Sequence, residues 1–197
     1  LLLLLSVAWA ESAISDANLP PENVDYVIAD FATSQTVAEH WREPEAASPG
    51  SLLKPFVTLA YGRKNGLAFP ELNCTGESCW LPGGHGRVGI VEAIAHSCNT
   101  FFRQLAMAVT PAEVGFESAR LGLRAPPPSS TPEALWGLRS GWFVTAHELL
   151  RAYSELVRRR SEPDAAIVLE GLRRAARSGT AGALAAKLAQ DTYAKTG

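Results

Sequence analysis

Ser48-Pro49-Gly50-Ser51-Leu52-Leu53-Lys54-Pro55-Phe56 is the stretch of the sequence that says most about the fold. Its Pro-Gly pair favours a turn into a helix, and its second proline is tolerated because a helix start leaves N–H groups unpaired anyway. Ser51 and Lys54 are three residues apart, so their side chains share one helix face about one turn apart. The stretch therefore predicts a helix that begins near Ser51 and ends near Gly62.

Ser51 and Lys54 also suggest chemistry, because a hydroxyl beside an amine can act as a nucleophile beside its base. The unpaired N–H groups and positive dipole end of a first helical turn favour negative charge that develops on Ser51. Apolar neighbours desolvate the pair, and desolvation disfavours a charged lysine, so we expect Lys54 to accept a proton. Alone, the pattern is weak, since a surface serine and lysine on an ordinary helix give the same spacing.

Length and composition predict a globular protein. The chain has 197 residues, 47% of them hydrophobic, which is enough for one sizeable domain with its own core. The formal net charge is −2, with acids and bases spread along the chain. A nucleic-acid partner is therefore not expected.

The first ten residues resemble the end of a secretory signal. Leu1 to Leu5 form an apolar run, and small residues follow at Ala8 and Ala10. We expect residues 1–10 to be the remnant of a signal peptide or of a membrane anchor. The globular part should then lie outside the cytoplasm, in the periplasm or on the outer face of the cytoplasmic membrane.

The three cysteines allow two interpretations. In an oxidising compartment Cys74 and Cys79 could form a disulfide that closes a small loop, leaving Cys98 free and buried. The less favoured alternative is zinc bound by these thiols together with His85 or His96. We assign no metal ligand and no cofactor, and we treat the histidines as structural.

Apolar periodicity and turn residues outline the other elements. The expected elements are a hairpin of strands over 24–31 and 36–41, a loop over 66–89, helices over 91–95 and from Thr100, an irregular connection over 121–135, a helix capped by Thr145 and Glu148, a helix from Pro163 to Ser178, an alanine-rich helix over 181–188, and a strand over 191–197.

Three motifs follow one another in the chain: Ser51-x-x-Lys54, Ser97-x-Asn99 and Lys195-Thr196-Gly197. Ser97 and Asn99 alternate around Cys98, so their side chains can point to one side while the thiol packs inward. Together the motifs resemble the signature of the active-site serine enzymes that react with penicillin.

The resemblance covers residues 24–197 and is to penicillin-binding protein transpeptidase domains of the serine DD-peptidase and β-lactamase superfamily. Flanking residues extend it: Pro49-Gly50, Lys54-Pro55, Gly84-His85-Gly86, Glu92-Ala93-Ile94, Thr100-Phe101-Phe102, 149–153 and Gly179-Thr180-Ala181. It implies an α/β fold of the α+β type, an antiparallel sheet flanked by helices plus a mostly helical subdomain. We expect this chain to lack the C-terminal part of such a domain and therefore to be inactive by itself.

The resemblance implies that the protein is a serine DD-transpeptidase or DD-carboxypeptidase. Its substrates would be the D-Ala-D-Ala ends of peptidoglycan stem peptides in cell-wall synthesis, and β-lactam antibiotics would be covalent inhibitors. Ser51 would form the acyl-enzyme, Lys54 would accept its proton, and Ser97 would relay a proton to the leaving nitrogen. These three groups supply the activated hydroxyl and the proton shuttle that acyl transfer needs.

The remaining motif residues would bind the substrate. Asn99 would hydrogen-bond the substrate's amide side chain, and Lys195 would add positive charge beside Ser97 and the substrate carboxylate. Thr196 would contact that carboxylate, and Gly197 would let the substrate backbone lie against the strand. The backbone N–H of the nucleophile would supply one oxyanion donor, while the residue after the third motif would supply the second.

Two alternatives stay open. The short intervals between the motifs are similar to those of small serine β-lactamases, including the oxacillin-hydrolysing class D type. Against the class D type, Asn99 stands where an apolar residue is expected. Against the commoner penicillinase type, no clear Glu-x-x-Leu-Asn deacylation motif lies between Leu121 and Gly179. The second alternative is a non-catalytic module that senses penicillin or binds wall peptides.

Overall fold

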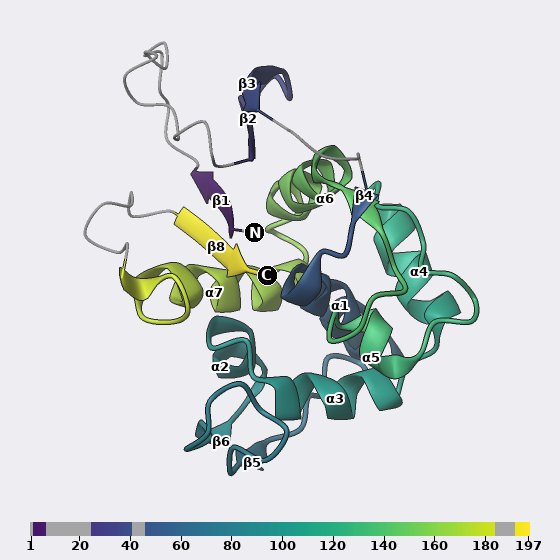
Figure 1. Ribbon diagram of the computed structural model, residues 1–197, viewed down its shortest axis with the longest axis vertical. Helices are drawn as coiled ribbons and strands as arrows, with labels where there is room; N and C mark the ends of the chain where they lie inside the picture. The colour runs from purple at the N-terminus through teal and green to yellow at the C-terminus, as the bar shows by residue number, and fades with distance from the viewer. Residues whose placement is uncertain (1, 7–24, 41–45, 184–191) are drawn as a thin grey trace.

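Helix α1 (Lys54–Lys64) lies at the centre of the computed structural model (Figure 1). The structure describes residues 2–6, 25–40, 46–183 and 192–197. A short 3-10 helix, η2 (Gly50–Leu53), leads directly into α1, whose residues from Lys54 to Ala60 are all buried. The helix expected from Ser51 is thus confirmed, and it runs to Lys64 rather than ending near Gly62.

Other helices surround α1. They are α2 (Ile90–Ala95), α3 (Asn99–Met107), α4 (Pro111–Arg120), α5 (Pro132–Leu135), α6 (Ala146–Arg158) and α7 (Pro163–Arg177). Helices α3, α4 and α7 pack against α1, and α2 packs on α7. The capping box predicted at the start of α6 is confirmed, since Thr145 and Glu148 each accept a hydrogen bond from the other's backbone N–H.

The strands pair in four two-stranded antiparallel sheets within the described residues. The pairs are β1 (Leu2–Ser6) with β8 (Thr192–Thr196), β2 (Tyr26–Ala29) with β3 (Thr36–His40), β4 (Ala46–Ala47) with β7 (Val144–Thr145), and β5 (Leu72–Cys74) with β6 (Gly86–Val88). The mixed α+β class is confirmed, as are the β2–β3 hairpin and the C-terminal strand. The one larger antiparallel sheet that the resemblance implied is not seen among these residues.

Strand β8 places the third motif at the centre of the molecule. It packs over α7, and its C-terminal end lies beside the start of α1 (Figure 1). Its pairing with β1 matches Leu2 to Thr196 and Ser6 to Thr192. The assignment of residues 1–10 to a leader or anchor stays a prediction.

Several sequence expectations differ from the structure. The loop expected over 66–89 contains the β5–β6 hairpin, and the connection expected over 121–135 ends in helix α5, which Thr131 caps. Helix α4 was not predicted; its own capping box, Thr110 with Glu113, is a signal that could have found it. Most of the alanine-rich helix expected over 181–188 lies outside the described residues.

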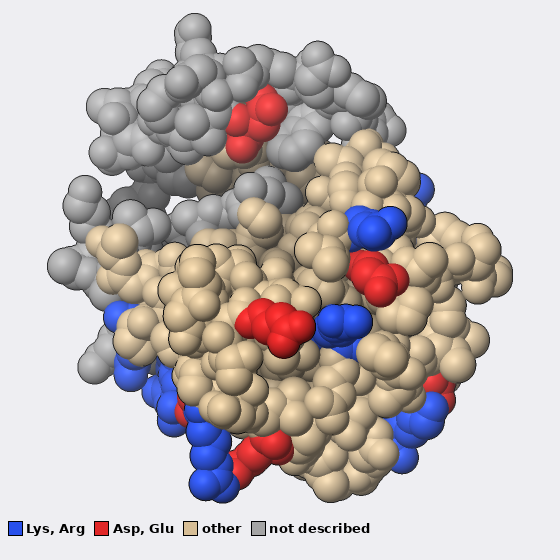
Figure 2. All heavy atoms as spheres, turned by 60° about the horizontal axis from the view of Figure 1, so that its bottom comes forward, with Lys and Arg blue, Asp and Glu red and all other residues tan. Residues whose placement is uncertain are grey.

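The surface carries mixed charge. Figure 2 shows one face on which lysines and arginines lie among acidic side chains over a mostly uncharged surface. Within the described part of the chain, no helix has the length and apolar character needed to cross a membrane.

Candidate active site

The Lys54 amine is the meeting point of the first two motifs. Its Nζ donates to the Ser97 carbonyl oxygen at 2.7 Å, to Ser97 Oγ at 2.9 Å and to Asn99 Oδ1 at 2.8 Å. Lys54 is fully buried at the start of α1, and the aromatic rings of Phe102 and Trp136 each lie 5.2 Å from Nζ. The structure therefore joins residues 43 and 45 positions apart in the chain.

The third motif reaches the same hydroxyl from the other side. Lys195, in β8, donates from Nζ to Ser97 Oγ at 3.0 Å and to the Thr196 carbonyl oxygen at 2.6 Å. Lys195 is also fully buried. Ser97 thus stands between two lysines that come from opposite ends of the chain.

Ser97 is held in an uncommon backbone conformation. Its φ is +51°, in the left-handed region that non-glycine residues visit rarely. It occupies the corner between α2 and α3, where Asn99 begins the second helix. The corner aims the Ser97 hydroxyl and the Asn99 amide oxygen at one lysine, as the alternation around Cys98 predicts.

Ser51 lies in η2, one turn before Lys54, and its side chain is half-buried. The hydroxyl makes no hydrogen bond with any other described residue. Hydrogen bonds between catalytic groups are often long in a free enzyme and shorten when substrate binds. The half-buried Ser51 hydroxyl is not engaged by another described side chain.

The end of β8 contacts the turn that carries Ser51. A Cβ atom on Gly197 would lie 2.7 Å from the Pro49 carbonyl oxygen, and one on Gly50 would lie 3.2 Å from the Gly197 carbonyl carbon. The Thr196 hydroxyl donates to the Thr180 hydroxyl at 3.0 Å. Glycine at 197 therefore allows an approach between the first and third motifs that a side chain would prevent.

Burial changes the proton affinity of both lysines. It lowers the pKa of Lys54 well below its usual value, and the nearby charge of Lys195 lowers that pKa further. Burial also lowers the pKa of Lys195 to about 7. Both amines therefore give up a proton more readily than an ordinary lysine, beside the hydroxyl that lies between them.

The contacts of Lys54 suit a group that takes and gives protons. An ammonium has three N–H donors, and three acceptors surround Nζ. A neutral amine keeps two N–H donors for the Ser97 carbonyl and Asn99, while its lone pair can accept a proton from a hydroxyl. The site can therefore hold both protonation states without moving its backbone.

Two further residues fix the site, and the sequence analysis gave neither of them this role. The Tyr153 hydroxyl, on α6, donates to the Leu52 carbonyl oxygen at 2.8 Å and so ties η2 to α6. Trp136, which follows α5 just beyond the connection that was expected to be irregular, lies over Lys54. No local pattern indicated the contact of Trp136 with Lys54, because that contact depends on tertiary packing.

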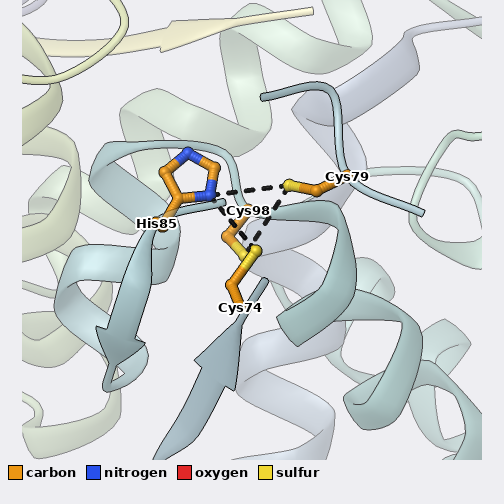
Figure 3. A group of neighbouring side chains, drawn as sticks. All are labelled: Cys74, Cys79, His85 and Cys98. Carbon is orange, nitrogen blue, oxygen red and sulfur yellow. Dashed lines mark hydrogen bonds between the residues drawn. The ribbon is translucent and has the colours of Figure 1, made fainter. Parts of the chain in front are cut away.

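The cysteines form a second cluster. Cys74, Cys79 and Cys98 are all free, so the Cys74–Cys79 disulfide is not present, while the expectation of a free and buried Cys98 is confirmed. His85 joins them, and one potential ligand atom from each residue lies within 4.8 Å of the others (Figure 3). These four residues could hold a metal ion, although the sequence analysis assigned no ligand. Four residues separate Cys74 from Cys79, which is within the range of zinc-binding pairs and could have favoured the zinc alternative.

Solved structures with a similar fold come from peptidoglycan synthesis. PBP2 from Pseudomonas aeruginosa, solved in complex with WCK 5153, has a TM-score of 0.61 and 17% identity over 73% of this chain and 48% of that one. A peptidoglycan glycosyltransferase from Burkholderia ambifaria has a TM-score of 0.58 and 20% identity over 77% and 65%. A chain of a peptidoglycan synthase complex that coordinates polymerization and crosslinking has a TM-score of 0.59 and 15% identity over 74% and 35%.

These likenesses concern the fold, because identities this low say little about activity. This chain spans between about a third and two thirds of the lengths of those chains. No protein-family model matches the sequence, and no curated protein matches it either. The chain therefore has a penicillin-binding-protein-like fold, shared with proteins of cell-wall synthesis.

Proposed function

We propose that this chain carries the acylating site of a penicillin-binding serine DD-transpeptidase or DD-carboxypeptidase. Its substrates are the D-Ala-D-Ala ends of peptidoglycan stem peptides, and β-lactams acylate the same serine. One observation supports the proposal above the others. Lys54 and Lys195 both donate to the Ser97 hydroxyl, beside the turn that carries Ser51.

The reaction begins when Ser51 Oγ attacks the carbonyl carbon between the two D-alanines. Lys54 takes the proton from the hydroxyl, and a bond forms between Oγ and the carbonyl carbon. The oxyanion is stabilised by the backbone N–H of Ser51, at the positive end of the first helical turn. The low pKa of Lys54 supports its role as the base.

Collapse of this intermediate breaks the C–N bond. Ser97, hydrogen-bonded to Lys54, gives its proton to the leaving nitrogen and takes the proton that Lys54 received. Terminal D-alanine departs with a neutral amine, and the acyl group stays on Ser51. An amine acceptor or water then reverses these proton movements and releases the acyl group.

Lys195 and Thr196 recognise the terminal carboxylate of the substrate in this proposal. A protonated Lys195 supplies positive charge from β8, and the Thr196 hydroxyl lies in the same strand. Asn99 has a different immediate role from the one that the resemblance implies, because its Oδ1 accepts from Lys54. Its amide nitrogen is the part that would donate to the substrate. With such substrates the protein would act in the periplasm or on the outer face of the cytoplasmic membrane.

The proposal is tested with the protein expressed from its complete gene. It is incubated with a stem pentapeptide that ends in D-Ala-D-Ala, with and without an amine acceptor, and free D-alanine and the peptide products are measured by mass spectrometry. We expect D-alanine release, and a crosslinked product with the acceptor if transfer dominates over hydrolysis. Ser51→Ala should abolish both products.

A parallel incubation with benzylpenicillin distinguishes the alternatives. Slow release of penicilloate from a long-lived adduct agrees with a DD-peptidase. Rapid turnover of penicillin without D-alanine release would instead assign a serine β-lactamase. If circular dichroism shows that the protein is folded and it catalyses neither reaction, the proposal is contradicted and a binding module is favoured.

A further inference from the structure

Three thiols and one imidazole converge beside the candidate active site. Cys74 ends β5, Cys79 lies in the loop that follows, His85 precedes β6, and Cys98 precedes α3. Figure 3 shows all four side chains pointing toward one space between the hairpin and the helix. Cys74 and Cys98 are buried, whereas Cys79 and His85 are partly exposed at the rim.

The distances fit one tetrahedral ion. His85 Nδ1 lies 3.6 Å from Cys74 Sγ and 3.5 Å from Cys79 Sγ, and Cys79 Sγ lies 4.0 Å from Cys98 Sγ. Zinc at about 2.3 Å from sulfur and about 2.0 Å from nitrogen separates its ligands by about 3.5 Å (N–S) and about 3.8 Å (S–S). A disulfide needs sulfurs about 2.05 Å apart, so it would require a larger rearrangement.

The local backbone is built to hold this geometry. A Cβ on Gly76 would lie 2.0 Å from the Pro82 carbonyl oxygen, and one on Gly84 would lie 2.1 Å from the Cys74 carbonyl oxygen. Both glycines have positive φ values, so the loop folds back on itself between the ligands. Strands β5 and β6 have three residues each, and a hairpin of this size is marginal without a further constraint.

The imidazole is oriented for this role. Two sulfurs approach the same nitrogen, Nδ1, so that nitrogen is the one that faces the cluster. Nε2 then carries the proton, and it is buried without a hydrogen-bond partner among the described residues. The Thr100 hydroxyl accepts from the Cys74 thiol at 3.4 Å and donates to the Glu77 carbonyl oxygen at 3.2 Å, so it is close enough to donate instead to the thiolate that zinc binding would create.

We infer that Cys74, Cys79, His85 and Cys98 bind one structural Zn²⁺ ion, and that the ion fixes the corner carrying Ser97 and Asn99. The ligand set is thiolate-rich and four-coordinate, which is typical of closed structural zinc sites. Cys98 is the residue between the two that hold Lys54, so a bond from Cys98 to the ion holds this corner in place. The second part of the inference rests on the proposed function, whereas zinc binding does not.

Zinc binding is tested on the protein expressed from its complete gene and purified under reducing conditions. Bound metal is counted by elemental mass spectrometry, and affinity is measured by competition with a chromophoric chelator. We expect one zinc ion more in the wild type than in Cys79→Ser or His85→Asn. Each variant should lose more than the about 10- to 100-fold in affinity that removal of an outer-shell partner costs.

His96→Gln is the matched control, because the His96 ring lies 5.7 Å from the His85 ring but outside the ligand set. It should retain the zinc ion and the wild-type affinity. Cobalt in place of zinc should give thiolate-to-cobalt absorption in wild type and control. Equal zinc retention by wild type and both ligand variants would overturn the inference, as would disulfide-linked thiols in the freshly purified protein.

A measurement on the wild type alone covers the case in which the variants misfold. Bound zinc should protect three thiols from a thiol reagent, and a chelator should expose them. If the purified protein holds no zinc and neither added zinc nor the chelator changes the reactivity of its thiols, the site does not exist.

The proposed effect of zinc on the corner that carries Ser97 and Asn99 is tested separately, through the rate of acylation. Removing zinc should slow β-lactam acylation, and restoring zinc should recover it. Acylation that is unchanged while zinc leaves would overturn this second part. A protein that binds zinc but never acylates would instead contradict the proposed function and leave the metal site standing.

Discussion

Burial of Lys54 changes how readily its amine gives up a proton. A fully buried lysine is costly as a cation, and here the cost is reduced by three acceptors and two aromatic rings. The same burial lowers the pKa of its amine. The lowered pKa is the property that the proposed role of Lys54 as a base requires.

Replacing Lys54 by methionine should remove the base and keep the apolar stem. We expect the rate of β-lactam acylation to fall by about 10²–10⁴-fold, the usual contribution of a positioned general base. Stopped-flow or gel-based acylation assays measure this, with circular dichroism as a check of folding. Lys64→Met is the matched control, because Lys64 ends the same helix in an exposed pair with Glu113; equal acylation by the two variants would show that Lys54 is not the base.

The lowered pKa of Lys195 predicts that the binding of a substrate carboxylate depends on pH. Its pKa of about 7 means that it loses its positive charge as the pH rises through 7. We therefore expect the KM for a peptide with a free terminal carboxylate to rise above pH 7. In Lys195→Arg the guanidinium stays charged, so the rise should disappear; a KM that rises equally in this variant would assign the effect to another group.

The same pKa shift predicts how stability changes with pH. Between about pH 7 and about pH 10.4 the unfolded state keeps a proton on Lys195 that the folded state has lost. The unfolded state binds more protons there, so the free energy of unfolding should rise with pH through that window. Urea denaturation of wild type and Lys195→Met measures it, and the variant should lack this contribution.

Residue-scale prediction succeeded where the signal was local. The spacing of Ser51 and Lys54 requires only a helix, and the alternation of Ser97 and Asn99 around Cys98 indicates a shared side, although the left-handed backbone of Ser97 that produces it was not predicted. Neither pattern predicts that Tyr153 reaches the Leu52 carbonyl or that Trp136 covers Lys54. Those contacts depend on how helices pack.

At the scale of elements, the turn before α1 is held by a close backbone contact. Gly137 follows α5 with φ of +85°, and a Cβ there would lie 1.8 Å from the Gly50 carbonyl oxygen. The backbone after α5 thus lies in close contact with Gly50, the residue just before Ser51. A glycine is required here for space as well as for its backbone angle.

Gly137→Ala should therefore displace the turn that carries Ser51. We expect a stability loss well above the about 1–2 kcal/mol that a left-handed backbone costs a non-glycine residue, with slower acylation. Gly66→Ala is the control, because Gly66 has φ of +59° with nothing within 4 Å of its added Cβ. Thermal unfolding and acylation rates compare the two; equal effects would show that the contact with Gly50 does not matter.

Elements were predictable where caps and periodicity agreed. Helix α6 was expected from its capping box, and α7 from a proline start and apolar spacing. The hairpin of β5 and β6 was missed because its strands have only three residues each and the segment between them contains Gly76, Gly83 and Gly84, which are typical of a loop. Its order depends on contacts with α3 that no local pattern contains.

At the scale of the whole molecule, the fold brings together three segments that the sequence keeps far apart. Ser97 and Lys195 are 98 positions apart and share a hydrogen bond. The meeting of β8 with η2 depends on the packing of β8 over α7 and on the small size of Gly197. The resemblance to a motif set predicted this meeting, whereas periodicity and composition did not.

The central claim is that Ser51 is acylated. The protein expressed from its complete gene is incubated with benzylpenicillin, digested and analysed by tandem mass spectrometry. Ser48→Ala is the matched control, since Ser48 is an exposed hydroxyl three residues earlier in the same stretch. We predict one penicilloyl adduct per chain, located on Ser51, kept in Ser48→Ala and lost in Ser51→Ala; an adduct on another residue, or none on the folded wild type, would contradict this claim.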